Sequence, residues 1–175
     1  MRKAKELIGK SIIHQATGEQ VATVHDVVFD ADTRKVAALL THTGGWFRNA
    51  KLVPWRNVMS IGDVVLVQGE LPVITTADAP AIADEIKPDA QISGTAIVSP
   101  SGERLGTAGD LFIDDNGVVV GYEVRQGFMS IGNHKFLPAE HVQAVGKDAI
   151  ITDVSDLGAV RDAGSGSGEQ GPSAT

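Results

Sequence analysis

SIIHQATGEQVATVHDVVFD, residues 11–30, decides the fold. Apolar and polar residues alternate on both sides of Thr17-Gly18, and a period of two is typical of β-strands. Gly18 in the middle of the stretch predicts a tight turn, because glycine adopts the positive φ that such turns require. The stretch therefore predicts a strand, a turn and a longer strand.

The same pattern returns 84 residues later in GTAIVSPSGERLGTAGDLFID, residues 94–114. Residues 9–67 and 93–151 share twelve identical positions, against about four expected by chance from average residue usage. The identical pairs are Ile13/Ile97, Gly18/Gly102, Glu19/Glu103, Thr23/Thr107, Asp26/Asp110, Asp30/Asp114, Val36/Val120, Asn49/Asn133, Lys51/Lys135, Pro54/Pro138, Val58/Val142 and Gly62/Gly146. One period is long enough for a small domain, so the chain is predicted to be one unit written twice.

Each unit contains further short apolar runs, such as KVAALLTHT in the first and VVVGYEVRQ in the second. Asn116-Gly117 is the strongest hairpin signal in the chain, because both residues tolerate positive φ. Pro54 and Pro138 lack the N–H that a central strand needs, so each marks a strand end or an edge. Short strands with turns about ten residues apart indicate a small closed or nearly closed barrel.

The predicted fold class is therefore all-β, with two small β-barrels in tandem. We expect barrels over residues 6–70 and 91–155, a Pro- and Ala-rich linker over 71–90, and a disordered tail over 158–175. A short helix over residues 80–86 is predicted inside the linker, with Asp78 able to cap it. The tail has almost nothing to bury, which is the composition of a disordered segment.

Composition excludes several classes of function. The net charge of −7 and the pI near 5.1 argue against a DNA-binding protein, because phosphate contacts need a basic face. The chain has no cysteine, which excludes disulfides and zinc sites built on thiolates. No apolar run approaches the roughly 20 residues of a membrane-spanning helix, so a cytoplasmic protein without a membrane span is expected.

No group of residues predicts catalysis. The five histidines are not paired at metal-ligand spacing, and DADTR and DDNG lack the distant glutamate of a calcium loop. We therefore expect no catalytic residue, no metal, no cofactor and no enzyme activity. Asp26 and Asp110 are predicted to accept backbone hydrogen bonds, and Gly18 and Gly102 to occupy matching turns.

Bulky apolar residues follow a glycine bend in each unit, at a place where a loop is usually polar. They could fold back as a plug over the barrel, or they could form the contact with a protein partner, with a second copy, or between the two barrels. The candidate contact residues are Trp46, Phe47, Phe128, Met129 and Ile131. Trp55, directly after Pro54, is predicted to pack in the core of the first barrel.

In this order, the TGEQVATVHDVVFD hairpin, the Gly-Gly-aromatic loop, KLVPW and the final apolar strands resemble the PRC-barrel. This is the small barrel of the photosynthetic reaction centre H subunit's cytoplasmic domain and of the C-terminus of a ribosome maturation factor. The resemblance implies about six strands per barrel and a docking or modulating role without a shared catalytic residue set. We therefore expect a non-catalytic protein-interaction or scaffold module. The alternatives are a small-ligand barrel with its mouth near Trp46 and Trp55, and an RNA-processing or ribosome-associated adaptor, which the acidic charge disfavours.

Overall fold

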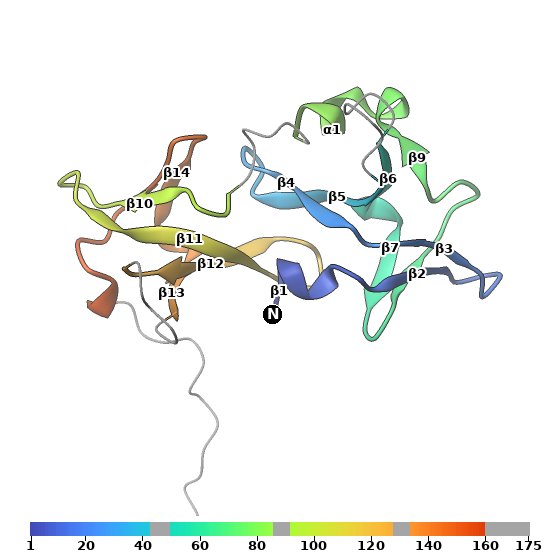
Figure 1. Ribbon diagram of the computed structural model, residues 1–175, viewed down its shortest axis with the longest axis horizontal. Coiled ribbons are helices and arrows are strands. Elements are labelled where there is room, and N and C mark those ends of the chain that lie inside the picture. Colours follow the sequence, from blue (N-terminus) through green and yellow to red (C-terminus); the bar gives the residue numbers. More distant parts are fainter. Residues whose placement is uncertain (43–49, 86–91, 128–133, 160–175) are drawn as a thin grey trace, which may run out of the picture.

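A computed structural model describes residues 1–42, 50–85, 92–127 and 134–159 and is built mainly of short strands (Figure 1). The strands of the first half are β1 (Arg2–Lys3), β2 (Ser11–His14), β3 (Gln20–Thr23), β4 (Asp26–Asp30), β5 (Lys35–His42), β6 (Lys51–Pro54), β7 (Val58–Ile61), β8 (Val65–Val67) and β9 (Ile74–Thr75). Those of the second half are β10 (Ala96–Val98), β11 (Arg104–Ile113), β12 (Val119–Arg125), β13 (His134–Pro138), β14 (Val142–Val145) and β15 (Ala149–Thr152). The described helical elements are α1 (Pro80–Glu85) and the single 3-10 turns η1 (Ala4–Leu7), η3 (Trp55–Asn57), η4 (Thr76–Asp78), η6 (Ala139–His141) and η7 (Leu157–Ala159).

The two units repeat their strands at the spacing of the sequence repeat. The parallel pairs β2–β8 and β10–β15 show it most directly, because Ile12 lies opposite Val65 and Ala96 lies opposite Ala149. The tandem arrangement of two small all-β units is therefore confirmed.

The second unit is a continuous sheet, in the order β13-β12-β11-β10-β15-β14, that curves into a half-barrel. The first unit follows the same path in two pieces, β4-β5-β6-β9 and β3-β2-β8-β7. The long strand β11 of the second unit corresponds to β3 and β4 of the first, which are separated at residues 24–25. The predicted Asn116-Gly117 hairpin between β11 and β12 is confirmed, and Gly117 has a φ of +77°.

The start of the chain lies with the second unit. β1 pairs with β11, which places Arg2 opposite Ile113 and Lys3 opposite Phe112. One hydrophobic core runs through both units and includes Leu7, Leu39 and Tyr122, all fully buried. The two units are therefore joined by shared packing as well as by the connecting chain.

The segment expected to lie outside both barrels covers the first unit. β9 pairs with β6, and Ile74 and Ile82 pack against a second, smaller core cluster on the outer side of that sheet. The cluster consists of Val28, Ala38, Leu40, Ala50 and Leu52. Residues 74–85 thus belong to the first unit, because the two isoleucines bury apolar surface there.

The short helix is present, as α1, but the expectation that Asp78 caps it is wrong. The Asp78 carboxylate accepts hydrogen bonds from the backbone N–H of Thr75, at 3.1 Å, and from its hydroxyl, at 2.7 Å. The bond from the Thr75 N–H is one half of a capping box on the preceding turn η4, and in the other half the Thr75 side chain accepts from the Asp78 backbone N–H. In the described part of the chain, no helix is long and apolar enough to cross a bilayer.

Candidate protein-binding surface

The aromatic loops predicted as the partner contact lie outside the described residues. Trp46 and Phe47 fall in residues 43–49, and Phe128, Met129 and Ile131 fall in residues 128–133. The described chain resumes after the second of these loops at His134, the first residue of β13. The surface built by β13 and its neighbours is therefore the described part of the molecule adjacent in sequence to the predicted contact.

Alternation along β12 creates two different faces of the second sheet. Tyr122 and Val124 are fully buried in the shared core, so Gly121, Glu123 and Arg125 point to the opposite side. We call this side the outer face; its residues are Phe112, Gly121, Glu123, Arg125, His134 and Phe136.

Two aromatic rings cover the middle of the outer face. Phe112 and Phe136 meet edge to face, with ring centroids 5.1 Å apart. A Cβ atom at Gly121 would lie 2.2 Å from the Phe136 ring, so only glycine lets the ring lie directly on the strand. The rings are half-buried, which leaves apolar surface available on the outer face.

Glu123 is the charged centre of the outer face and is only 4% exposed. Its Oε1 atom lies 2.8 Å from Lys3 Nζ and 2.8 Å from His134 Nδ1, and its Oε2 atom lies 4.0 Å from Arg125. Burial acts to raise the pKa of Glu123, but the hydrogen bond and charge of Lys3 and the charges of His134 and Arg125 together lower it. The carboxylate is thus held ionised inside a ring of donors.

The partners of Glu123 reach solvent. The side chains of Lys3, Arg125 and His134 are 37%, 47% and 45% exposed. Two permanent cations and one histidine therefore surround one buried carboxylate. The outer face presents positive charge to solvent in a protein whose net charge is −7.

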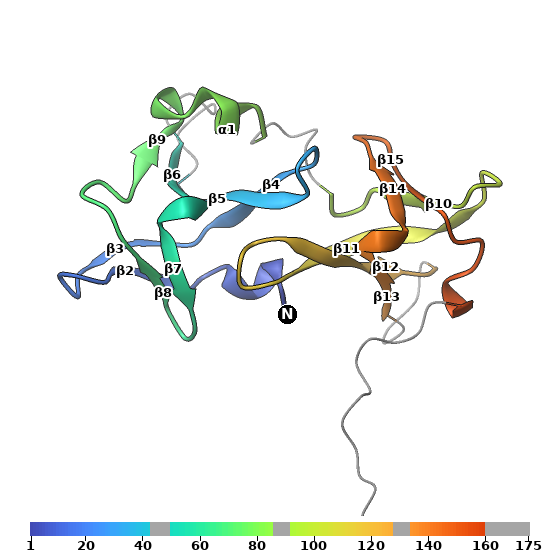
Figure 2. The same ribbon diagram turned by 180° about the vertical axis from the view of Figure 1, so that it is seen from behind.

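The corresponding face of the first unit is aliphatic and covered. Ala38 lies opposite Pro54 as Gly121 lies opposite Pro138. Leu40 and Leu52 likewise form the cross-strand pair that Glu123 and Phe136 form in the second unit. In Figure 2, α1 and β9 lie beside β6 on the first unit. Within the described residues, β13 is the last strand of its sheet, and neither a strand nor an α-helix lies beyond it.

Trp55 lies at the junction of the two units rather than inside the first barrel. Its indole Nε1–H donates a hydrogen bond to the carbonyl oxygen of Asn116 at 2.9 Å, and its ring lies against Gly117. The reciprocal contact joins Arg34 of the first unit to the carbonyl oxygen of Ala139, the sequence counterpart of Trp55, at 3.3 Å. Each unit thus places a hairpin against the 3-10 turn of the other.

The two matching aspartates have different surroundings. Asp110 is buried and accepts hydrogen bonds from the backbone N–H of Leu111, at 2.8 Å, and of Lys5, at 3.3 Å. Burial raises the pKa of Asp110, although these hydrogen bonds and the charge of Lys5 oppose the change. Asp26 is exposed and accepts one bond, from the N–H of Val27 at 2.8 Å.

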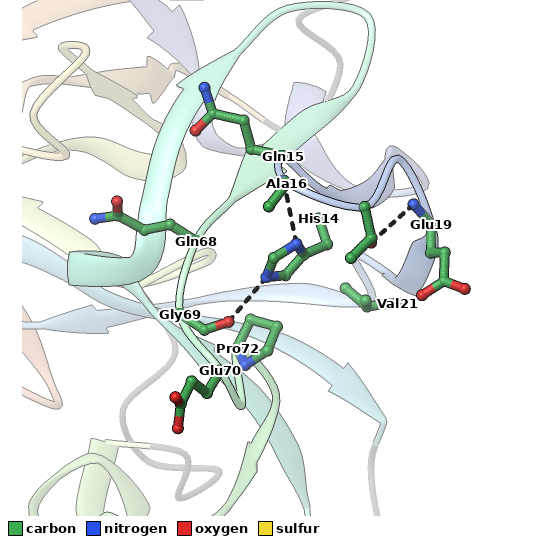
Figure 3. Close-up of a pocket in the computed structure, with 10 residues that line it drawn as sticks. His14, Gln15, Ala16, Glu19, Val21, Gln68, Gly69, Glu70 and Pro72 are labelled. Carbon is green, nitrogen blue, oxygen red and sulfur yellow. Dashed lines mark hydrogen bonds between the residues drawn. The ribbon is translucent and has the colours of Figure 1, made fainter.

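The first unit carries a groove of about 730 Å³ beside His14, shown in Figure 3. His14 Nε2 donates to the Gly69 carbonyl oxygen at 2.8 Å, and Nδ1 accepts from the N–H of Ala16 at 3.2 Å. Both ring nitrogens are therefore occupied by backbone, which ties two loops together and leaves neither nitrogen for a ligand. A second groove of about 430 Å³ is lined by Thr23, Thr41, His42 and Lys51 among others.

Neither groove is lined by Trp55, and the alternative of a ligand-binding mouth near Trp46 and Trp55 falls partly outside the described residues, because Trp46 does. Within the described residues, no group of three or more acidic, histidine or cysteine side chains is arranged to hold a metal ion. The matching turn glycines, Gly18 and Gly102, have φ values of +71° and +83°. Pro54 and Pro138 are the last residues of β6 and β13.

The model of the PRC-barrel domain family matches residues 1–70 and 84–157. The chain therefore belongs to the PRC-barrel family and carries two PRC-barrel domains in tandem. A search of curated proteins found no match to the chain.

The outer face was not among the residues predicted from the sequence. The signal that could have found it is the alternation in VVVGYEVRQ, which places Gly121, Glu123 and Arg125 on one side of a strand and Tyr122 and Val124 on the other. Comparison of the repeats adds that Leu52 of the first unit is replaced by Phe136. Because aromatic residues and arginine are enriched in protein interfaces, Phe136 together with Arg125 is the sequence signal of a contact surface.

Proposed function

We propose that this chain is a non-catalytic protein-interaction module of the cytoplasm. In its first unit the outer sheet face is covered by residues 74–85, and its second unit presents the outer face to a partner. One observation supports this proposal above the others: the same sheet face is covered by residues 74–85 in the first unit and uncovered, among the described residues, in the second.

The composition of the outer face favours a protein partner. Aromatic side chains and arginine are enriched in protein interfaces, and the outer face combines Phe112 and Phe136 with Arg125. An RNA adaptor would need a broad basic surface, whereas Glu123 is surrounded by two permanent cations, Lys3 and Arg125, and by the histidine His134.

A matched pair of charge reversals tests the proposal. Arg125→Glu places an acid on the outer face, whereas Lys147→Glu makes the same charge change in the exposed turn after β14. We expect a partner captured from lysate by the unmodified protein to be retained by Lys147→Glu and lost by Arg125→Glu, with both variants folded by circular dichroism. Equal retention by the two variants would place the binding surface elsewhere.

A further inference from the structure

Residues 74–85 show how a chain segment can cover one of these sheets. Ile74 lies opposite Leu52 and Thr75 lies opposite Lys51, so β9 extends the sheet as an antiparallel edge strand. The N–H of Thr76 then donates to the carbonyl oxygen of Ala50 at 3.0 Å, before the chain turns into α1. Ile74 from the strand and Ile82 from the helix pack on the aliphatic cluster.

The edge of β13 is equivalent to the edge of β6 that pairs with β9 in the first unit. The repeat conserves Lys51 as Lys135 and Pro54 as Pro138, and both strands pair on one side with the preceding strand of their sheet. On its other side, β13 has no strand partner among the described residues. An unpaired edge strand is a template for an extended segment, whose main chain completes the ladder.

The chemistry of the outer face selects a different segment from the one on the first unit. Leu40 is replaced by Glu123 with its exposed cationic partners, so a segment lying here needs carboxylates to match Lys3 and Arg125. Phe112 and Phe136 still need apolar side chains to cover them. Residues 161–175 of this chain contain no aliphatic residue larger than alanine, so they do not have this composition.

We infer, on the basis of the proposed function, that the partner binds the second unit through an acidic strand–helix segment. Its strand pairs with the free edge of β13, and its helix lays aliphatic side chains on Phe112 and Phe136 while its carboxylates face Lys3 and Arg125. The second unit is thereby completed in trans, as the first unit is completed in cis by residues 74–85.

A labelled peptide with the sequence of residues 71–86, LPVITTADAPAIADEI, is the probe, because it has the required strand, helix, isoleucines and acids. Three reference peptides accompany it: one with its acids changed to lysine, one N-methylated at alternate strand residues, and one with Ile74 and Ile82 changed to serine. Fluorescence anisotropy with the full chain at low salt measures the dissociation constant of each. We expect binding about tenfold weaker for each reference peptide, and about tenfold weaker binding of the probe to Arg125→Glu than to Lys147→Glu.

Four results would overturn the inference. In the first, the probe does not bind the full chain at about 1 mM. In the second and third, the lysine peptide or the N-methylated peptide binds as tightly as the probe. In the fourth, the probe binds Arg125→Glu as tightly as it binds Lys147→Glu. Stronger probe binding after removal of residues 160–175 would identify the chain's own end as the occupant. A wild-type dimer that Arg125→Glu makes monomeric, without probe binding, would identify a second copy. If the probe fails but the lysate partner is still lost with Arg125→Glu, the proposed function stands and only the strand–helix inference falls.

Discussion

Replacing Glu123 by glutamine should weaken the attachment of β1 to the second unit. The substitution keeps the size of the side chain but removes the charge that two donors, Lys3 and His134, contact at 2.8 Å. Hydrogen bonds to a charged group contribute about 1.5–3 kcal/mol each when buried. Both donors are more than a third exposed and can return to water, so we expect a total loss of about 2 kcal/mol in the free energy of unfolding at pH 7.

The loss should depend on pH in a defined direction. The pKa of Glu123 is lower in the folded protein than its ordinary value, so its ionised form stabilises the fold above the unfolded-state pKa of about 4.3. That contribution disappears as the pH falls through the folded-state pKa. The raised pKa of Asp110 has the opposite effect, stabilising most at low pH and losing its contribution as the pH rises. The charge of Glu123 is one cause of the raised pKa of Asp110, so Glu123→Gln lowers that pKa toward its ordinary value and the Asp110 contribution cancels only in part.

Urea denaturation of the wild type and of Glu123→Gln at pH 7 and near pH 3 measures this difference. Glu140→Gln is the matched control, because the Glu140 side chain is 80% exposed and lies 3.9 Å from its nearest basic partner, His141. We expect the control to change stability by less than about 0.5 kcal/mol. A Glu123→Gln effect no larger than the control at pH 7, or one undiminished near pH 3, would refute the role of the carboxylate.

Three further sets of substitutions test other parts of the structure in the same urea assay. Trp55→Ala should lower the free energy of unfolding by about 2 kcal/mol, less than the loss of a fully buried tryptophan, because the indole is half-buried at the junction. A loss below about 0.5 kcal/mol would mean that the junction contributes little to stability. Gly18→Val and Gly102→Val should each lower the free energy of unfolding by about 1 kcal/mol or more, because both glycines have a positive φ. Gly62→Val is the control and should lower it less, because Gly62 has an ordinary φ and open space around it. Equal effects at the three sites would contradict the turn assignment. Tyr122→Phe should raise stability by about 1 kcal/mol, because the buried hydroxyl has no hydrogen-bond partner among the described residues; a comparable loss would show that the hydroxyl has a partner after all.

The strands could be predicted from the sequence because their signal is local. Alternation on both sides of Gly18 and Gly102, and the repeat itself, depend only on residues close together in the chain. The junction carries no such signal. Trp55 and Asn116 are 61 residues apart, and Lys3 and Glu123 are 120 residues apart. Burial of Trp55 was expected from its residue type, but the surface that covers it belongs to the other unit.

The sequence predicts a linker over residues 71–90 because the two anchors of the covering segment belong to different elements. Ile74 is on a strand and Ile82 is on a helix, so neither a period of two nor one of 3.6 connects them. The prolines and alanines around them are typical of a linker. For the outer face, the alternation was present but was hidden by the valines that fill both sides of β12 at its start.

The pairing of β1 with β11 has a consequence during synthesis. β1 cannot pair with β11 until Ile113, the partner of Arg2, has been synthesised. At ribosomal rates of about 5–20 residues per second, the interval between the two residues is roughly 5–20 s. The first unit can pack most of its own strands in that time, since the partner strands of β2 to β9 lie within residues 11–75, apart from the bridge between Lys35 and Val118. During this interval Glu123 has not yet been synthesised, so Lys3 lacks this ion-pair partner and β1 stays unpaired. A segment that is synthesised early and docks late is accessible to a protease on the nascent chain, and becomes protected only when the second unit folds.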